Sequence, residues 1–355
     1  MMQLDDLLER IKAAHDDHVP LRIRGAGSKD FYGGMLAGEV FDVAPYAGIL
    51  AYEPTELYIT ARCGTRLAEI EAELAGKGQM LAFEPPHFGA ATLGGCIAAG
   101  LSGPRRMAAG GVRDFVLGAK LIDGTGQVLD FGGQVMKNVA GYDVSRLLAG
   151  SLGTLGLIAE ATLKVLPRPV AEQTLCFDFD AAESIAKLNE WGGRPLPISA
   201  SFWFANCLYL RLSGAQAAVD AAIRALAQAG GKPIAAVDAA KHWISVREQT
   251  HPAFAAATLW RCALPSTAPL SSDDSLQAIE WGGALRWYAD APDGLRSEAA
   301  VSGGHAVLYR AAESKRCLDG AFAPLSPALL ALHRRLKKSF DPKGILNPGR
   351  LYAEF

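Results

Sequence analysis

The chain has 355 residues, of which half are hydrophobic and a fifth are charged. This composition is typical of a folded globular protein of about two domains, and it excludes a disordered chain, a collagen and a small disulfide-stapled protein. Lysine and arginine total 35 against 37 acidic residues, so the net charge of −2 shows no electrostatic footprint for nucleic acid.

The N-terminal region predicts one helix followed by short strands. Apolar residues recur at helical spacing over 4–11. Thr65 is placed to cap a second helix over 67–74. The strands between these helices are expected at 21–24, 39–43, 49–52 and 57–62.

Glycine-rich stretches interrupt the elements that follow. The segment 83–111 has too few large side chains to fill a core, so it must place its backbone against something else. A hairpin is expected over 117–131, with its turn at 123–126. A second glycine-rich stretch, 150–156, leads into an apolar strand over 157–166.

The Pro-Arg-Pro sequence at 167–169 predicts a domain boundary, because prolines end a strand and begin an extended linker. The order beyond it is strand, helix, strand, strand, helix, strand, which is the split β-α-β arrangement of a ferredoxin-like layer. These elements are expected at 173–179, 181–191, 198–204, 207–212, 214–229 and 232–237. Weaker signals continue to about residue 310, and a last helix is expected over 327–340.

The six cysteines form no C-x-x-C pair, so no zinc or iron–sulfur motif is present. We expect reduced thiols in a reducing compartment, at positions 63, 96, 176, 207, 262 and 317. The N-terminus lacks the apolar region of a signal peptide, and no run of 18 apolar residues occurs. These features predict a cytoplasmic protein without a transmembrane segment.

A basic cluster lies in and after the last predicted helix. Its members are Arg334, Arg335, Lys337, Lys338 and Lys343. The cluster is either a solvated helix face or a docking surface, and the sequence leaves both open. The seven histidines are scattered, and neither H-E-x-x-H nor G-x-S-x-G is present.

The separated glycine turns indicate a binding site for a pyrophosphate. They lie at 25–27, 94–103, 110–111 and 150–156. Backbone N–H groups that converge on a doubly charged group form an anion nest, which requires residues without bulk that tolerate positive φ. The small residues from Gly94 to Gly100 also allow a flat ring to lie close to the main chain.

Four segments together resemble the PCMH-type FAD-binding domain of the vanillyl-alcohol oxidase-like flavoproteins. They are RGAGSK at 24–29, the stretch from PP to GLSG at 85–103, GVRD at 111–114 and GSLGTLGLI at 150–158. FDPKGILNPG at 340–349 is similar to the closing segment of the glycolate oxidase and D-lactate dehydrogenase branch. The resemblance covers about 1–168 and 325–355 and is greatest to the FAD-binding subunits of glycolate oxidase.

The resemblance implies an α+β fold in three parts. A PCMH-type FAD-binding domain of two α+β subdomains would span 1–168, and a ferredoxin-like α+β cap domain with extra elements would span 169–320. A C-terminal segment over 321–355 would return to the FAD domain. The positions implied to contact FAD are Arg24, Gly25, Ala26, Gly27, Ser28, Lys29, Pro86, Thr92, Gly94, Gly95, Ala98, Ser102, Gly103, Arg113, Asp114, Gly153, Gly156, Ile158 and Asn347.

The family's pattern also assigns a part of FAD to each segment. The first loop, residues 24–29, would donate to the pyrophosphate, and the second loop, within 85–103, would face the phosphates and the flavin. Ser102 and Gly103 would line the dimethylbenzene side of the flavin or the ribityl chain. The GVRD segment would begin the strand that lies beside the adenine half of FAD. The third glycine loop, residues 150–158, would hold adenine and ribose, and Asn347 would return near the isoalloxazine.

Two departures from the family pattern change the expectation. Members that bind FAD covalently carry a histidine in the first loop, where this chain has Ser28 and Lys29, so we expect noncovalent FAD. Oxidising subunits of this branch carry a G-E-H-G-I-G segment whose histidine helps to hold a metal. The nearest match here, at His305, lacks the acid and the trailing glycines. His305 is thus the one catalytic candidate, the alternative is an exposed strand-start histidine, and no metal site is expected.

The resemblance implies an FAD subunit that supports oxidation of glycolate, a 2-hydroxy acid, to glyoxylate and transfers electrons through flavin. Its partners would be a larger paralogous FAD subunit and an iron–sulfur subunit, and peripheral attachment to the inner membrane through that complex is left open.

One alternative is a self-sufficient FAD dehydrogenase of a small hydroxy acid or sugar lactone, with substrate groups among Arg247, Arg261, His305 and Arg310. Another is a cofactor-free scaffold of the same fold. The group that stabilises reduced flavin is left open among Lys29, Arg106 and Arg113.

Overall fold

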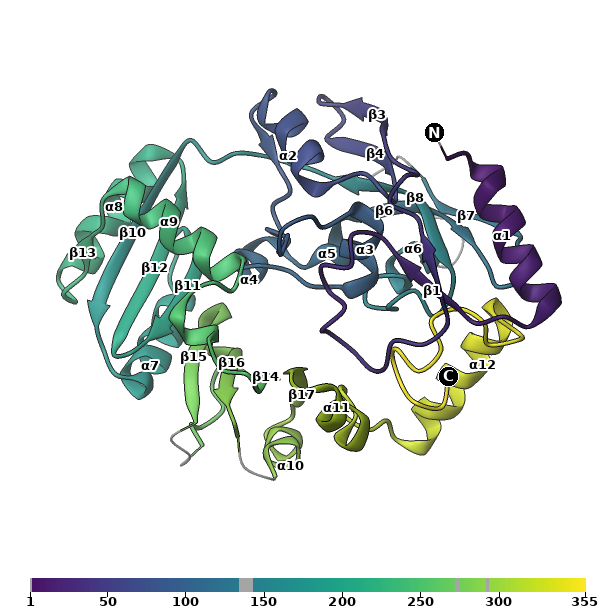
Figure 1. The fold of residues 1–355 in the computed structure, drawn as a ribbon. Helices are drawn as coiled ribbons and strands as arrows, with labels where there is room; N and C mark the ends of the chain where they lie inside the picture. The colour runs from purple at the N-terminus through teal and green to yellow at the C-terminus, as the bar shows by residue number, and fades with distance from the viewer. Residues whose placement is uncertain (1, 134–142, 272–274, 292–293) are drawn as a thin grey trace.

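The computed structural model describes residues 2–133, 143–271, 275–291 and 294–355, and two large sheets organise the chain (Figure 1). The first sheet is antiparallel throughout and belongs to the N-terminal half. Its order is β3 (Ile49–Glu53), β4 (Tyr58–Arg62), β8 (Leu157–Lys164), β6 (Val116–Ile122) and β7 (Val128–Gly132). The strands and the hairpin expected in this half are therefore confirmed, with shifts of one or two residues at their ends.

Helices α2 (Leu67–Ala75) and α3 (Leu93–Ala99) pack in the same hydrophobic core as this sheet. Shorter elements connect the sheet to the rest of the half. They are β5 (Gln79–Met80), α4 (Arg106–Ala109), α5 (Val112–Phe115), α6 (Val144–Leu147) and β9 (Leu166–Pro167). Because β9 pairs with β5, the chain leaves this half at the Pro-Arg-Pro sequence.

The two ends of the chain meet beside the first sheet. Helix α1 (Leu4–Asp17) leads into β1 (Leu21–Arg24), which pairs in parallel with β2 (Glu39–Asp42). The C-terminal helix α12 (Pro327–Phe340) is followed by a segment that lies against β1, where Leu21 bridges Leu346 (Figure 1). Leu7, Ile11 and Ile345 share one core there, so the last residues complete the N-terminal fold.

The second sheet has eight strands, and its first four follow the ferredoxin-like pattern. The order is β13 (Lys232–Pro233), β10 (Ala171–Asp178), β12 (Cys207–Gly214), β11 (Ile198–Phe204), β15 (Leu276–Glu280), β16 (Leu285–Ala289), β14 (Leu259–Ala263) and β17 (His305–Arg310). Helix α7 (Ala181–Gly192) and helix α8 (Gln216–Ala227) confirm the two helices of the predicted split β-α-β unit.

The strand predicted over 232–237 is mostly wrong. Only β13, two residues long, pairs with β10, and the chain then enters α9 (Ala236–Arg247). Ala239, Trp243 and Val246 recur at helical spacing and are buried, so packing of this helix face outweighs the apolar residues that suggested a strand.

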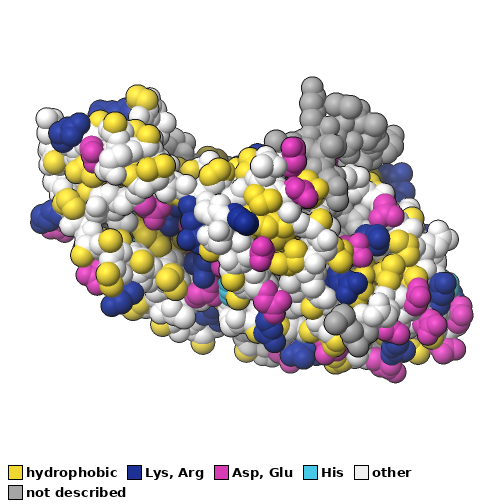
Figure 2. Space-filling model, turned by 90° about the horizontal axis from the view of Figure 1, so that it is seen from above, with side chains coloured by type: hydrophobic (Ala, Val, Ile, Leu, Met, Phe, Trp, Pro, Cys, Tyr) yellow, Lys and Arg dark blue, Asp and Glu magenta, His cyan; other side chains and the backbone are white. Residues whose placement is uncertain are grey.

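The remaining helices, α10 (Leu295–Val301) and α11 (Glu313–Asp319), flank β17 in the chain. The core on one face of the second sheet includes Trp287 and Tyr309 together with Tyr32, Ala99 and Leu152 of the N-terminal half. The two sheets are thus joined by apolar packing. Figure 2 shows hydrophobic side chains interspersed with side chains of both charges over the face seen from above.

Buried ion pairs also join the two halves. Glu84 accepts from Arg105 Nε at 3.3 Å and from Arg211 Nη2 of β12 at 2.9 Å. Burial alone would raise the pKa of Glu84, but the Arg211 and Arg105 guanidinium groups outweigh it and hold this pKa below its usual value. Arg105 also donates to Glu172 of β10 at 2.7 Å.

Two further sequence expectations are corrected. Thr65 does not cap α2, because its hydroxyl accepts from Gly48 N at 2.9 Å and leaves Arg66 as the uncapped N-terminal residue. Cys176 and Cys207, expected as thiols, form a disulfide between β10 and β12, since antiparallel pairing of these strands brings their Cα atoms to 6.5 Å. Over the described ranges, no helix is long and apolar enough to cross a membrane.

Candidate functional site

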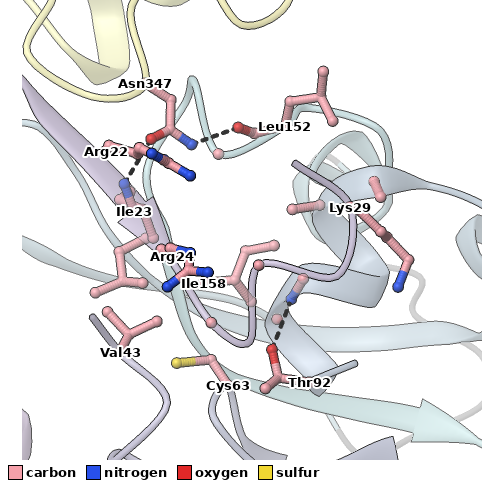
Figure 3. Close-up of a pocket in the computed structure, with 18 of the residues that line it drawn as sticks. Arg22, Ile23, Arg24, Lys29, Val43, Cys63, Thr92, Leu152, Ile158 and Asn347 are labelled. Atoms are coloured by element: carbon pink, nitrogen blue, oxygen red, sulfur yellow. Dashed lines mark hydrogen bonds between the residues drawn. The ribbon is translucent and has the colours of Figure 1, made fainter. Parts of the chain in front are cut away.

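A pocket of about 110 Å³ lies where three loops and the C-terminal segment meet (Figure 3). It brings together most positions predicted to contact FAD. These are Arg24, Gly25, Ala26, Gly27, Ser28, Lys29, Thr92, Gly94, Gly95, Ala98, Gly153, Gly156, Ile158 and Asn347. Sequence reasoning missed further lining residues, namely Arg22, Ile23, Asp30, Leu36, Val43, Cys63, Ala99, Leu152, Leu157 and Arg350.

Five predicted positions do not line this pocket: Pro86, Ser102, Gly103, Arg113 and Asp114. Ser102 and Asp114 shape the turn around α5, where the Ser102 hydroxyl accepts from Val112 N at 3.0 Å and the Asp114 carboxylate accepts from Gly111 N at 2.8 Å. Gly103 lies toward the second sheet, where its carbonyl accepts from Trp281 Nε1 at 3.2 Å. Arg113 is exposed and Pro86 is buried.

The first loop presents free backbone donors to the pocket. Within the described chain, the N–H groups of Ala26, Gly27 and Ser28 have no protein acceptor. Gly27 has φ of 70°, a conformation that L side chains rarely adopt, and its carbonyl accepts from Asp30 N at 3.1 Å. Consecutive unpaired N–H groups at such a turn form a nest for an anion, and this donor set fits a pyrophosphate.

The pocket walls approach each other so closely that side chains are excluded. A Cβ atom on Gly25 would lie 2.3 Å from Thr92 Oγ1, and one on Gly94 would lie 2.7 Å from Cys63 Cβ. Gly95 differs, because a Cβ there would meet only Thr92 Oγ1, at 3.3 Å, beside open pocket space. The glycines at 25 and 94 are thus needed for packing, whereas Gly95 leaves room for a ligand.

The charged residues of the pocket are partly neutralised. Arg22 and Arg24 both form ion pairs with Asp30. The distance from Arg24 Nε to Asp30 Oδ2 is 3.3 Å. Burial lowers the pKa of the Lys29 amino group, which lies 5.4 Å from the Phe88 ring, while Cys96 and Glu248 act in the opposite direction. In Figure 3 the Lys29 side chain extends away from Asn347.

Asn347 ties the C-terminal segment to the pocket. Its side-chain oxygen accepts from Ile23 N at 2.7 Å, and its side-chain nitrogen donates to Leu152 O at 2.7 Å (Figure 3). Its φ is 44°, in the left-handed region that asparagine tolerates better than most residues. The amide thus connects β1, the third glycine loop and the C-terminal segment.

Lys337 corrects the interpretation of the basic cluster. It is 4% exposed, and its ammonium donates to Thr154 O at 2.8 Å, to Asp341 Oδ2 at 2.7 Å and to Leu346 O at 2.9 Å. Burial lowers the pKa of Lys337, while Asp341 acts to raise it. One member of the cluster is therefore an internal support of the third glycine loop, while Arg334, Arg335 and Lys338 are exposed.

An aromatic seam separates the first loop from the second sheet. Tyr32 lies 5.3 Å from Tyr309 between ring centroids, and Phe31 lies 5.5 Å from the same ring. His305 is exposed at the start of β17, where partial desolvation and then the charge of Arg261 lower its pKa. Among the described residues, no three His, Cys, Asp or Glu side chains group as a metal site.

Arg247 and Arg310, two further substrate candidates, already have partners. Arg247 Nε donates to Glu248 Oε1 at 2.8 Å, and Arg310 Nη1 donates to Phe254 O at 2.9 Å. The Arg261 guanidinium instead lies over indole rings, 4.9 Å from the Trp281 centroid and 5.9 Å from that of Trp287.

The buried carboxyl group of Glu280, at the end of β15, predicts that the stability of the fold depends on pH. Burial raises the pKa of this carboxyl to about 7, against the effects of the Trp287 hydrogen bond and Arg261. A carboxyl whose pKa is higher in the folded state stabilises the fold fully below about pH 4.5, and this contribution is lost as the pH rises through 7. We expect urea unfolding between pH 5 and pH 8 to show a loss of up to about 3 kcal/mol that Glu280→Gln removes. The exposed control Glu9→Gln should keep the wild-type pH dependence, and an unaltered dependence in Glu280→Gln would refute the assignment.

Comparison with known proteins decides the family. A sequence profile described as FAD binding domain matches residues 3–132, and one described as FAD linked oxidases, C-terminal domain, matches residues 322–351. The chain is 47% identical over 352 residues to glycolate oxidase subunit GlcE of Escherichia coli (strain K12), covering 98% of this chain and 97% of that protein. The chain belongs to the GlcE family. It is an FAD-binding oxidoreductase of the FAD-linked oxidase type, as the sequence resemblance implied.

Two more distant proteins agree with this placement. Glycolate oxidase subunit GlcD of Bacillus subtilis (strain 168) is 31% identical over 186 residues, which is 51% of this chain and 39% of that protein. A structure of p-cresol methylhydroxylase with substrate bound has a TM-score of 0.74 at 13% identity, covering 100% of this chain and 88% of that chain. The second likeness shows the fold alone and confirms the expected PCMH-type FAD-binding fold for this GlcE-family chain.

Proposed function

We propose that this chain is the FAD-binding subunit of a complex that oxidises glycolate to glyoxylate. The observation that carries the proposal is the pocket of unpaired backbone donors, found in a chain 47% identical over nearly its whole length to a glycolate oxidase subunit. The partners would be a larger GlcD-like FAD subunit, as the shared similarity to GlcD suggests, and an iron–sulfur subunit. The complex would lie in the cytoplasm or at the inner membrane surface.

We propose noncovalent FAD in the pocket. The N–H groups of Ala26, Gly27 and Ser28 would hold the pyrophosphate, and Gly153, Gly156 and Ile158 would hold the adenosine half. The first loop has no histidine to form a covalent link. Bound FAD supplies two-electron oxidation together with single-electron transfer to an acceptor.

We also propose the division into an FAD-binding domain over 1–168, a cap over 169–320 and a returning segment over 321–355. The cap's eight-stranded sheet shares a core, through Tyr309 and Trp287, with Tyr32, which follows the first loop. Oxidation of glycolate removes two electrons and two protons. The chain's own contribution is to position FAD and to exclude water, while the partner subunits receive the electrons.

Purification of the chain alone and with its partners tests the proposal. We expect the isolated chain to be yellow, to release all its FAD when denatured, and to give negligible glycolate-dependent dye reduction. Co-expression with the GlcD-like and iron–sulfur subunits should give glycolate-dependent dye reduction.

Each other outcome has a clear meaning. Full glycolate turnover by the chain alone would favour a self-sufficient dehydrogenase. A colourless protein that does not take up added FAD would favour a scaffold. An assembled complex that oxidises D-lactate but leaves glycolate unchanged would reject the substrate assignment and keep the subunit assignment.

A further inference from the structure

Lys29 differs from the arginines that line the same pocket. Arg22 and Arg24 pair with Asp30, and Arg350 donates to two backbone carbonyl groups of the segment that follows the first loop. Each of these arginines therefore has protein groups that hold its charge in place. The Lys29 ammonium has no carboxylate oxygen within 4.0 Å in the part of the chain that the structure describes.

The acid that acts on Lys29 is already engaged by other donors. Glu248 raises the pKa of Lys29, but its carboxylate accepts from the N–H groups of His87 and Phe88, at 3.1 Å and 2.7 Å. Lys29 itself donates one long hydrogen bond, of 3.4 Å, to Ser28 Oγ. Burial is the largest effect on the pKa of Lys29 and lowers it, because the ammonium is desolvated without an anion beside it. Such a cation attracts negative charge more strongly than one in water does.

Lys29 points to the side of the pocket that α3 lines with small residues. In Figure 3 its side chain extends away from Asn347, and its Nζ atom lies 5.4 Å from the Phe88 ring centroid. The Cys96 thiol of α3 supplies no anion, because burial raises its pKa to about 12. The small residues of α3 on this wall leave room for a flat ring. The ammonium therefore lies on the side of the pocket that suits the flavin ring.

The two other cations that the sequence left open as partners of reduced flavin do not line the pocket. Arg113 is exposed. The Arg106 guanidinium lies over the Trp281 ring, with its Cζ atom 4.4 Å from the ring centroid. Of these three candidates, the structure therefore places only Lys29 in the cofactor pocket.

We propose that Lys29 stabilises the negative charge that the flavin ring of bound FAD gains on reduction. Uptake of two electrons and one proton converts the neutral oxidised ring into an anion, and a cation in the pocket favours this product over the oxidised form. The anionic ring in turn raises the pKa of Lys29 and keeps the ammonium protonated. The inference rests on the proposed function for the presence of FAD, and it makes Lys29 a residue that sets the reduction potential.

Potentiometric titration of the FAD-loaded chain tests this role. Lys29→Met keeps the length of the side chain and removes its charge. We expect this variant to bind reduced FAD, relative to oxidised FAD, at least tenfold more weakly than the wild type does, which lowers the two-electron midpoint potential by about 30 mV. Sulfite adds to oxidised flavin and leaves a negative charge on the ring, so its affinity should also fall at least tenfold.

Two further variants separate the effect of charge from that of structure. Lys29→Arg retains the charge and should restore most of the potential and of the sulfite affinity. Lys77→Met removes an exposed charge that follows α2 in the same half of the chain, and it should leave both values unchanged. Flavin absorbance and the melting temperature show that each variant is folded and loaded.

Three results would overturn the role of Lys29. A wild-type potential in Lys29→Met would do so even if the affinity for FAD falls, since equal weakening of both oxidation states assigns the charge to the pyrophosphate. A low potential that Lys29→Arg leaves uncorrected would indicate a structural effect. Failure of Lys29→Met to take up FAD would show that the residue serves binding alone.

The same measurements separate this inference from the proposed function. A potential that depends on Lys29, in a chain whose assembled complex leaves glycolate unchanged, would support the role of Lys29 and reject the proposed substrate. Glycolate oxidation by the complex, together with a wild-type potential in Lys29→Met, would reject the role of Lys29 and keep the proposed function.

Discussion

Replacement of Gly95 by leucine is expected to abolish FAD binding and leave the fold intact. Gly95 lies within α3, and a Cβ atom there meets only Thr92 Oγ1, at 3.3 Å. Leucine is a strong helix former, so the backbone should accept it, whereas its side chain would occupy pocket space. We expect the FAD affinity to fall at least a hundredfold, about 2.7 kcal/mol, in a flavin fluorescence titration.

Gly192→Leu is the matched control for this experiment. Gly192 lies at the exposed end of α7, and nothing lies within 4 Å of a Cβ atom built there. Both variants should melt within a few degrees of the wild type, and only Gly95→Leu should lose FAD. Wild-type FAD affinity in Gly95→Leu would mean that this pocket is not where the cofactor binds.

Replacement of Lys337 by methionine should cause the largest loss of stability of any single change considered. The ammonium is buried and donates to Asp341 and to the carbonyls of Thr154 and Leu346. Removing it leaves the Asp341 carboxylate, which is 1% exposed, without its cation. Breaking a buried ion pair in this way costs about 3–5 kcal/mol, which urea unfolding followed by circular dichroism should detect.

The control is Lys338→Met, one residue further along the same helix and exposed. It should change the unfolding midpoint little. Because Lys337 supports the third glycine loop through Thr154, Lys337→Met should also release FAD at a lower urea concentration than the control. Equal stability of the two variants would show that the buried pair contributes nothing measurable.

The local pattern of the sequence predicted most elements of the first half. Apolar residues at helical or alternating spacing marked α1, α2 and β4, and a run of apolar residues marked β8, which is buried along most of its length. The glycine turns predicted the pocket, because close approach of backbones excludes side chains there. Helix α9 was not predicted, because its alanine-rich start is compatible with either a strand or a helix.

The charged partners around the site could be identified only from the three-dimensional structure. The pairing of Arg22 and Arg24 with Asp30 depends on how the first loop folds back, which residue spacing does not encode. Lys337 and Asp341 were within reach of sequence reasoning, since residues four apart face each other at a helix end. The stacking of Arg106 and Arg261 on Trp281 joins segments with no local signal in common, and only packing of the two sheets reveals it.

The contact between Asn347 and Ile23 joins positions 324 apart in the chain. During translation the N-terminal glycine loop leaves the ribosome long before the asparagine that completes its pocket is made. Cofactor loading must therefore await synthesis of the C-terminal segment, and until then the newly made chain exposes an incomplete pocket.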